Sequence, residues 1–220
     1  MNVLVIAPHA DDEILGVGAT MAKYIAQQDQ VFVCIATKGA KPIFDDVYVA
    51  KIREETVKAH NLLKVTETFF LEFPAVMLEQ IPRHEINGKI LDVVQKVKPD
   101  IVYIPHFGDM QKDHQIIAEA AMVAVRPKYD HTIKAIYSYE TLSETEWNTP
   151  HVANSFNPNV YNDVSSYLND KFRALECFGS QLSDFPNPRS LEAIEALAKY
   201  RGSTINVRAA EAFVLIRQIM

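Results

Sequence analysis

The sequence predicts an α/β protein with a Rossmann-like, mostly parallel β-sheet between two layers of helices, three layers in all. Short apolar runs alternate with segments of helical periodicity, which is the pattern of right-handed βαβ units. The runs are apolar at successive positions, as in strands that are buried on both faces. The chain has 220 residues and is 48% hydrophobic. This size and composition allow a sizeable core, and we expect one domain over residues 1–220.

The first half of the chain contains four expected strands and three expected helices. The strands are short and rich in apolar and β-branched residues, at residues 3–7, 31–37, 67–71 and 100–104. The segments between them repeat apolar residues at spacings of three and four, which predicts helices at residues 15–28, 49–64 and 80–97. In the common strand order 3-2-1-4-5, the first and fourth strands are neighbours.

The second half is less regular. We expect a helix, a fifth strand and two further helices, in that order, at residues 115–125, 132–139, 165–179 and 190–201. Residues 140–164 are rich in Ser, Thr, Asn and Pro and contain the only tryptophan. This composition predicts a long loop of the kind that forms a lid or a binding surface.

Composition and charge exclude several functional classes. The 22 Lys and Arg residues against 28 Asp and Glu residues give a net charge of −6, so nucleic acid and anionic membranes are not expected partners. Cys34 and Cys177 lie in apolar segments without CxxC spacing, which suits a reducing compartment. The N-terminus lacks a basic segment, and its apolar run is too short for a signal peptide or membrane anchor. We therefore expect a cytoplasmic protein.

A cluster of ionisable residues follows the first expected strand. It reads His-Ala-Asp-Asp-Glu at residues 9–13, at the strand end where open α/β sheets bind ligands. If a helix begins near Asp11, then His9 and Asp12 converge on one point and offer a nitrogen and an oxygen to a divalent cation. Asp11 then lies beside the metal without binding it.

A second cluster, HFGDMQKDH at residues 106–114, follows the fourth strand. Because the first and fourth strands flank the crevice at the switch point of the sheet, the two clusters face each other. Taken singly, each acid suits a helix N-cap and each histidine a solvated loop. Together the clusters favour a site of two histidines and one carboxylate with an open position, which is typical of catalytic zinc. Such a zinc lowers the pKa of its water to ~7, and Asp11 can accept the proton.

These motifs resemble the PIG-L/LmbE-like zinc-dependent deacetylases, which remove the acetyl group from N-acetylglucosamine-type sugars. The opening motif is HADDEILGVGAT, and it implies that His9 and Asp12 bind zinc and that Asp11 is the general base. The second motif contains Asp109 and closes with an Asp-His pair, which implies His114 as the third ligand. Asp109 and Asp113 are expected beside the ligands. Further similarities are KIREETVKAHNLL, YETLSETEW, PNPRS and AEAF.

The resemblance also implies a cofactor, a substrate class and an assembly. The cofactor is Zn²⁺, or another divalent transition metal, since a site with two histidines and one aspartate accepts several. The substrate is a small-molecule amino sugar, and the family often forms homo-oligomers, as trimers or hexamers. Arg53 is expected to reach into the site, where its planar fork suits sugar hydroxyls or phosphate oxygens.

Three further residues, Glu140, Trp147 and Arg189, are assigned to the substrate, each with an alternative. Trp147 and Tyr139, at the two ends of YETLSETEW, either stack on a pyranose ring or belong to the core. Glu140 and Arg189 either orient ligands or pair with each other. Glu211, in the closing AEAF segment, either supports the site or lies at the surface.

One departure from the family pattern concerns catalysis. Many members have a histidine three residues before the last zinc ligand, and here that residue is Gln111. Glutamine cannot shuttle a proton but can donate a hydrogen bond to an oxyanion. We therefore expect Gln111 to help hold the tetrahedral intermediate, while Asp11 moves the proton from water to the departing nitrogen. His106 is either a substitute acid or a structural loop residue.

The leading hypothesis is zinc-dependent hydrolysis of the N-acetyl amide of an amino sugar or its conjugate, releasing acetate and a free amine. A close alternative is amide hydrolysis on a thiol–sugar conjugate. Gln111 favours a third hypothesis, a sugar-binding or assembly protein that keeps its metal but has no activity. A dinucleotide-binding function is excluded because no GxGxxG follows the first strand.

Overall fold

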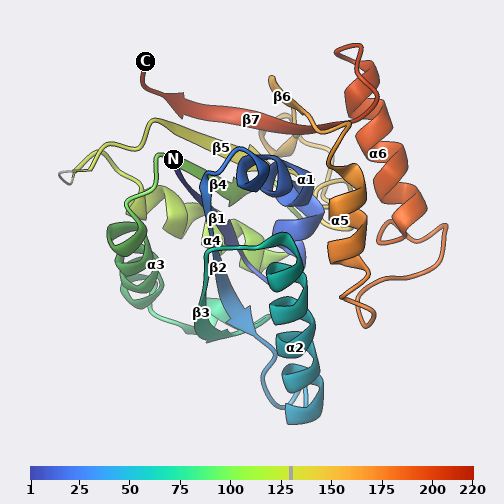
Figure 1. Ribbon diagram of the computed structural model, residues 1–220. Coiled ribbons are helices and arrows are strands. Elements are labelled where there is room, and N and C mark those ends of the chain that lie inside the picture. The colour runs from blue at the N-terminus through green and yellow to red at the C-terminus, as the bar shows by residue number, and fades with distance from the viewer. Residues whose placement is uncertain (129–130) are drawn as a thin grey trace.

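The computed structural model describes residues 1–128 and 131–220. Its centre is a seven-stranded sheet with the order β3-β2-β1-β4-β5-β7-β6 (Figure 1). The strands are β1 (Asn2–Ala7), β2 (Gln30–Lys38), β3 (Glu67–Pro74), β4 (Ile101–Pro105), β5 (Ala135–Tyr139), β6 (Val160–Asp163) and β7 (Ala210–Gln218). The pairings among β1 to β5 are parallel, and β7 pairs antiparallel with β5 and β6. The predicted mostly parallel α/β fold is confirmed.

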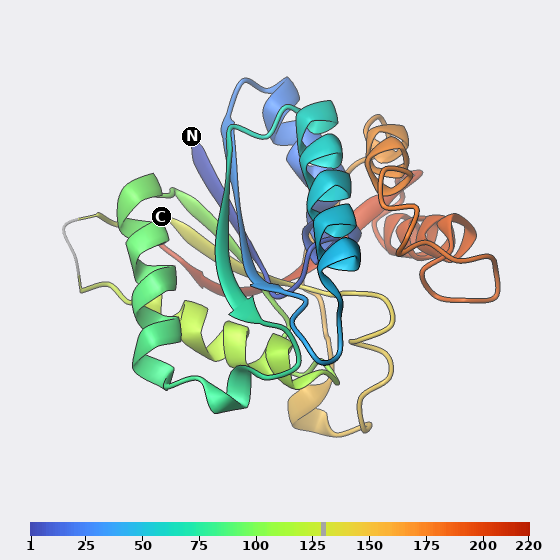
Figure 2. The ribbon, with the colours of Figure 1, turned by 90° about the horizontal axis from the view of Figure 1, so that it is seen from below.

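Helices cover both faces of the sheet and complete the three layers (Figure 2). They are α1 (Asp12–Ala26), α2 (Asp46–Leu63), α3 (Arg83–Val97), α4 (Lys112–Ala124), α5 (Leu168–Leu175) and α6 (Leu191–Ser203), with short 3-10 helices η1 (Leu78–Gln80) and η2 (Val152–Asn154). One hydrophobic cluster joins α3 and α4 to the sheet. A second joins α1, α2 and α5 to the opposite face.

Strand β1 is the central strand that positions the site. Residues 3–7 are completely buried, as expected of an apolar strand covered on both faces. Val5 pairs with Val33 of β2 on one side and with Tyr103 of β4 on the other. The carboxyl ends of β1 and β4 therefore lie side by side, as the predicted strand order required.

The structure corrects the sequence predictions in the second half of the chain. The expected loop at residues 140–164 contains β6 and η2, and the closing AEAFVLIRQ segment, for which no element was expected, is strand β7. Strand β6 could not be predicted because it is a four-residue edge strand, VYND, with no buried residue and no apolar run. The helix expected at 165–179 is confined to α5, and the strand expected at 132–139 begins at Ala135.

Helix α1 approaches β5 so closely that Gly16 is required at their contact. A Cβ at Gly16 would overlap the ring of Tyr139, which is fully buried and donates a hydrogen bond to the Ile6 carbonyl at 2.9 Å. Tyr139 is therefore a core residue, and the interpretation that it stacks on a sugar is wrong. The carbonyl that it contacts belongs to β1, so the same contact fixes α1 against the strand that ends at the site.

We expect Gly16→Ala to lower the free energy of unfolding by about 1–3 kcal/mol, because the added methyl group overpacks this contact. Urea denaturation monitored by circular dichroism measures the change. Gly88→Ala in α3 is the matched control, because nothing lies within 4 Å of a Cβ there, and alanine favours a helix interior by up to ~1 kcal/mol. Equal losses of stability in both variants would contradict the close packing of α1 on β5.

Candidate metal centre and active site

Three side chains converge where the carboxyl ends of β1 and β4 meet. His9 follows β1, Asp12 begins α1 and His114 lies in the first turn of α4. One ligand atom from each lies within 4.8 Å of the others. Oδ2 of Asp12 is 3.3 Å from Nδ1 of His9 and 3.2 Å from Nε2 of His114. The structure thus brings together the three residues that the sequence singled out as metal ligands.

Two further carboxylates orient the histidine rings. Nδ1 of His114 lies 2.9 Å from Oδ2 of Asp109, and Oδ1 of Asp109 accepts a 2.6 Å hydrogen bond from the Thr145 hydroxyl. Nε2 of His9 lies 3.0 Å from Oδ2 of Asp113. If each of these ring nitrogens carries the proton, the other nitrogen of each ring keeps its lone pair for a ligand.

The donor set suits a cation because it concentrates negative charge in a buried place. Burial by itself lowers the pKa of both imidazoles, but the adjacent carboxylates outweigh it and raise the pKa of His9 to about 9 and that of His114 to about 10. Oδ1 of Asp12 and Nε2 of His114 are buried and have no hydrogen-bond partner within residues 1–128 and 131–220. A bound metal ion would satisfy unpaired buried ligand atoms of this kind.

Asp11 lies beside these residues, and its carboxylate pairs with Arg189. Its φ of 106° turns the backbone away from helical geometry, and its side chain makes no capping hydrogen bond to α1. Instead, Oδ2 of Asp11 accepts a 2.6 Å hydrogen bond from Nη1 of Arg189, whose Nε donates to the Ser143 hydroxyl at 2.8 Å. Burial raises the pKa of Asp11 to about 8 against the opposing charge of Arg189. The alternative that Asp11 is an ordinary N-cap is wrong.

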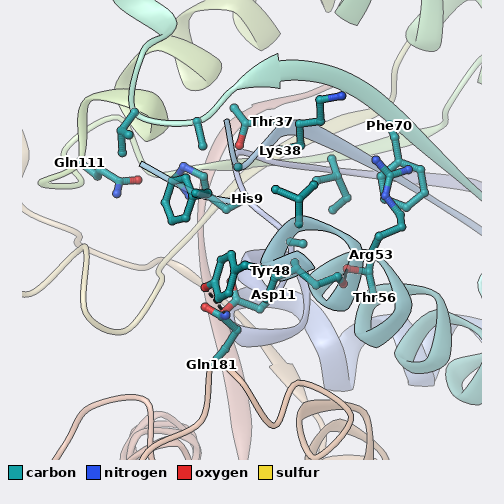
Figure 3. A pocket seen from close by; sticks show the side chains of 18 of the residues that line it. His9, Asp11, Thr37, Lys38, Tyr48, Arg53, Thr56, Phe70, Gln111 and Gln181 are labelled. Carbon is teal, nitrogen blue, oxygen red and sulfur yellow. Dashed lines mark hydrogen bonds between the residues drawn. The ribbon is translucent and has the colours of Figure 1, made fainter. Parts of the chain in front are cut away.

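His9, Asp11 and Arg189 line a cavity of about 240 Å³ (Figure 3). Figure 3 places Gln111 at one end of the cavity, Arg53 and Phe70 at the other, and His9 between them. The wall near Arg53 is largely apolar, formed by Ile35, Phe44, Val49, Ile52 and Phe70. An amide bond at the metal centre would therefore have room on both sides.

The residues predicted to bind substrate occupy different places. Arg53 lines the cavity, stacks 3.5 Å above the centre of the Phe70 ring and forms an ion pair with Glu72. Arg189 also lines the cavity, where it contacts Asp11. Of the predicted set, these two face the site.

Glu140 and Trp147 do not line this cavity. Glu140 accepts two hydrogen bonds from Arg201, at 2.8 and 2.6 Å, so the alternative that it pairs with Arg189 is wrong. Trp147 is 55% exposed, so it is not a core residue. Both residues lie in the segment that follows β5, where no periodicity fixes the direction of a side chain.

His106 and Glu211 have structural roles. Nε2 of His106 lies 3.0 Å from the Asn154 carbonyl, and the residue does not line the cavity. Glu211 of β7 is buried, pairs with Lys171 at 2.7 Å and accepts hydrogen bonds from Ala19 and Thr20 of α1. Glu211 therefore connects α1, the helix that begins at Asp12, to strand β7.

Sequence reasoning missed Glu144 and Thr145. Oε2 of Glu144 accepts a 3.2 Å hydrogen bond from the Gln111 backbone N–H, and its side chain lines the cavity. Thr145 holds Asp109, the carboxylate that orients His114. Both belong to the YETLSETEW stretch, which follows a strand of the central sheet at its ligand-binding edge. Their position after β5 was the available signal.

Comparison with known proteins places the chain in a family. A family model described as GlcNAc-PI de-N-acetylase, PIG-L, matches residues 4–125, more than half of the 220-residue chain. The chain belongs to the PIG-L family. The resemblance predicted from the two motifs is thus confirmed, and the chain is a hydrolytic N-deacetylase of a metal-dependent family.

Relatives of this PIG-L protein cover most of its length. It is 28% identical over 181 residues to the uncharacterized deacetylase YaiS of Escherichia coli K12, covering 80% of this chain and 89% of the relative. It is 25% identical to the diacetylchitobiose deacetylase of Thermococcus kodakarensis, covering 96% and 81%. The crystal structure of the conserved protein TT1542 from Thermus thermophilus has a TM-score of 0.79 at 22% identity, covering 99% and 96%. In the described residues, no helix is long and apolar enough to cross a membrane.

Proposed function

We propose that this PIG-L protein is a zinc-dependent hydrolase that removes the N-acetyl group from an N-acetyl amino sugar or its conjugate. The observation that carries the proposal is the convergence of His9, Asp12 and His114 on one point, with Asp11 close by but bound to Arg189. This arrangement supplies a cation site with room for substrate and a separate base. The proposal includes the cytoplasmic location and the trimer or hexamer expected from the sequence.

The residues fit a divalent transition metal, and zinc in particular. Two imidazole nitrogens and one carboxylate oxygen form the ligand set of a catalytic zinc that keeps an open position. A cation bound there polarises the amide carbonyl and lowers the pKa of a water molecule. Asp109 and Asp113 hold the rings of His114 and His9 in the orientation that such binding requires.

Asp11 has the position of a general base. Its carboxylate lines the cavity, and the residue lies in the same turn as Asp12. The ion pair with Arg189 fixes the direction of the carboxylate. Positive charge close to Asp11, from Arg189 and from a bound cation, favours its ionised form. Asp11 then accepts a proton from the attacking water, and the amide carbon gains an oxygen.

Gln111 has the position of a hydrogen-bond donor to the oxyanion. It lines the cavity, and the N–H groups of its side-chain amide can donate to an oxyanion. We expect Gln111→Ala to lower kcat about 100-fold, the usual loss for one oxyanion donor, with the metal content unchanged. Lys112→Ala, which changes the exposed residue next to Gln111, is the control. Unchanged turnover in Gln111→Ala would remove this residue from the mechanism.

The substrate class rests on the site and on its relatives. One relative is named a diacetylchitobiose deacetylase, an enzyme that by its name acts on an N-acetylated sugar. Arg53 offers its guanidinium at the far end of the cavity, where it would bind hydroxyls or an anionic substituent of the sugar.

Acetate release from a panel of N-acetylated amino sugars, free and nucleotide-linked, tests the proposal. We expect release by the zinc-loaded protein and none after chelation. Sugar binding without release from any member, together with an Asp11→Asn variant of unchanged affinity, would instead support the metal-retaining sugar-binding protein that Gln111 favours.

A further inference from the structure

The proposed reaction needs a proton donor for the departing nitrogen as well as a base for the water. Gln111 cannot supply a proton, because its amide does not titrate. Among the described residues that line the cavity, two have carboxyl groups, Asp11 and Glu144. Their surroundings differ, and residue pairs of this kind commonly divide the roles of base and acid.

Asp11 is held as the base. Its carboxylate is bound by the Arg189 guanidinium at 2.6 Å, a contact that stabilises the ionised form. The same contact fixes Asp11 on the side of the cavity that carries Arg189. Gln111 belongs to a different part of the chain, the turn before α4.

Glu144 is held beside Gln111 by two contacts between neighbouring loops. Its carbonyl accepts a 3.0 Å hydrogen bond from the Met110 N–H, and its Oε2 accepts a 3.2 Å bond from the Gln111 N–H. Within the described chain this is the one hydrogen bond to its carboxyl group, and no cation pairs with it. The residue is 7% exposed, so its remaining oxygen is largely screened from bulk water.

We propose that Glu144 is the general acid that protonates the leaving nitrogen, an inference that rests on the proposed deacetylase function. Water first loses a proton to Asp11 as its oxygen bonds to the amide carbon. The C–N bond then breaks, its electron pair goes to nitrogen, and the nitrogen takes the proton of the Glu144 carboxyl. The products are acetic acid and the free amine, and the proton on Asp11 returns to Glu144 through solvent.

The surroundings of Glu144 support this role. Burial raises the pKa of its carboxyl group, an effect that positive charge on His114, His9 and Arg189 opposes. A raised pKa favours the protonated carboxyl group, which is the form that a general acid needs. The alternative is that Glu144 only holds the loop before α4 through the Gln111 N–H.

Glu144→Gln separates the two roles, because glutamine keeps the shape and one acceptor oxygen for the Gln111 N–H but cannot give up a proton. We expect kcat for the N-acetyl sugar to fall about 100-fold or more, and hydrolysis of 4-nitrophenyl acetate to change less than about threefold, because that leaving group needs no proton. Glu146→Gln is the matched control. It alters an exposed acid of the same loop whose carboxylate also accepts a backbone hydrogen bond, from the Ser143 N–H at 2.6 Å.

A second measurement needs neither turnover nor metal. In the metal-free protein, the Glu144 carboxylate would lie next to the ammonium group of glucosamine. Calorimetric titration should give an affinity for glucosamine about tenfold weaker in Glu144→Gln, about the value of one charge-assisted hydrogen bond, with N-acetylglucosamine affinity unchanged. Equal glucosamine affinities in both proteins would overturn the assignment.

The outcomes distinguish this inference from the function on which it rests. A native protein that hydrolyses no N-acetyl sugar refutes the proposed function, and the inference with it. A native enzyme that is active, with Glu144→Gln equally active, refutes the inference alone. Parallel losses of amide and ester hydrolysis in Glu144→Gln, with less bound metal, would leave Glu144 only its loop-holding role and also overturn the assignment.

Discussion

Replacing Asp11 with asparagine is expected to lower kcat for deacetylation by about 10²–10⁴-fold, the usual contribution of a general base. Asparagine has nearly the same volume as aspartate but cannot accept the proton of the attacking water. The three proposed metal ligands, His9, Asp12 and His114, are untouched, so the protein should still bind one metal ion. Metal content by mass spectrometry and steady-state acetate release on the same samples measure both quantities.

The substitution also leaves Arg189 without its charged partner. A buried guanidinium that loses its carboxylate costs stability, so part of a fall in activity could come from a displaced Arg189. The double variant Asp11→Asn with Arg189→Met removes that charge. If Asp11 is the base, the double variant recovers stability but not turnover. Asp92→Asn, on the exposed side of α3, is the control for the substitution itself. Full activity in Asp11→Asn would contradict the proposed role.

The first five strands could be predicted from sequence because their signals are local. The run at residues 3–7 is apolar at every position since both its faces are covered, and its burial in the structure is complete. Strand β6 gives no such signal. Its residues VYND lie at the sheet edge and pair with β7, which comes some fifty residues later in the chain. An edge strand of four residues is defined by its partner and not by its own composition.

The candidate site likewise has one part that the sequence predicts and one part that it does not. His9, Asp11 and Asp12 lie in one turn, and β1 and β4 bring them to His114 whatever the loops do. In contrast, the contact between Asp11 and Arg189 joins residues 178 positions apart, and that between Gln111 and Glu144 joins residues 33 positions apart. Both contacts depend on loops without periodicity, so sequence reasoning assigned Arg189 to the substrate and missed Glu144.

Replacing His114 with alanine is expected to abolish stoichiometric zinc binding and, with it, nearly all deacetylase activity. The site would keep one nitrogen and one carboxylate, too few ligands for a stable catalytic zinc. Asp109→Asn is the graded variant, because it keeps His114 but weakens the hydrogen bond that orients its ring. A loss of about 10–100-fold in metal affinity is expected there. Competition with a chromophoric chelator measures both affinities.

Thermal unfolding gives a test of the same ligands that does not depend on substrate. A metal that binds only the folded chain stabilises it by about 2.7 kcal/mol at a free concentration of 100 times its Kd. Zinc should therefore raise the Tm of the native protein and of His84→Ala, a control on the exposed face of α3, but not that of His114→Ala. A full Tm rise in His114→Ala would mean that the cation is held elsewhere, and the carboxylates around His9 and His114 would then need a different explanation.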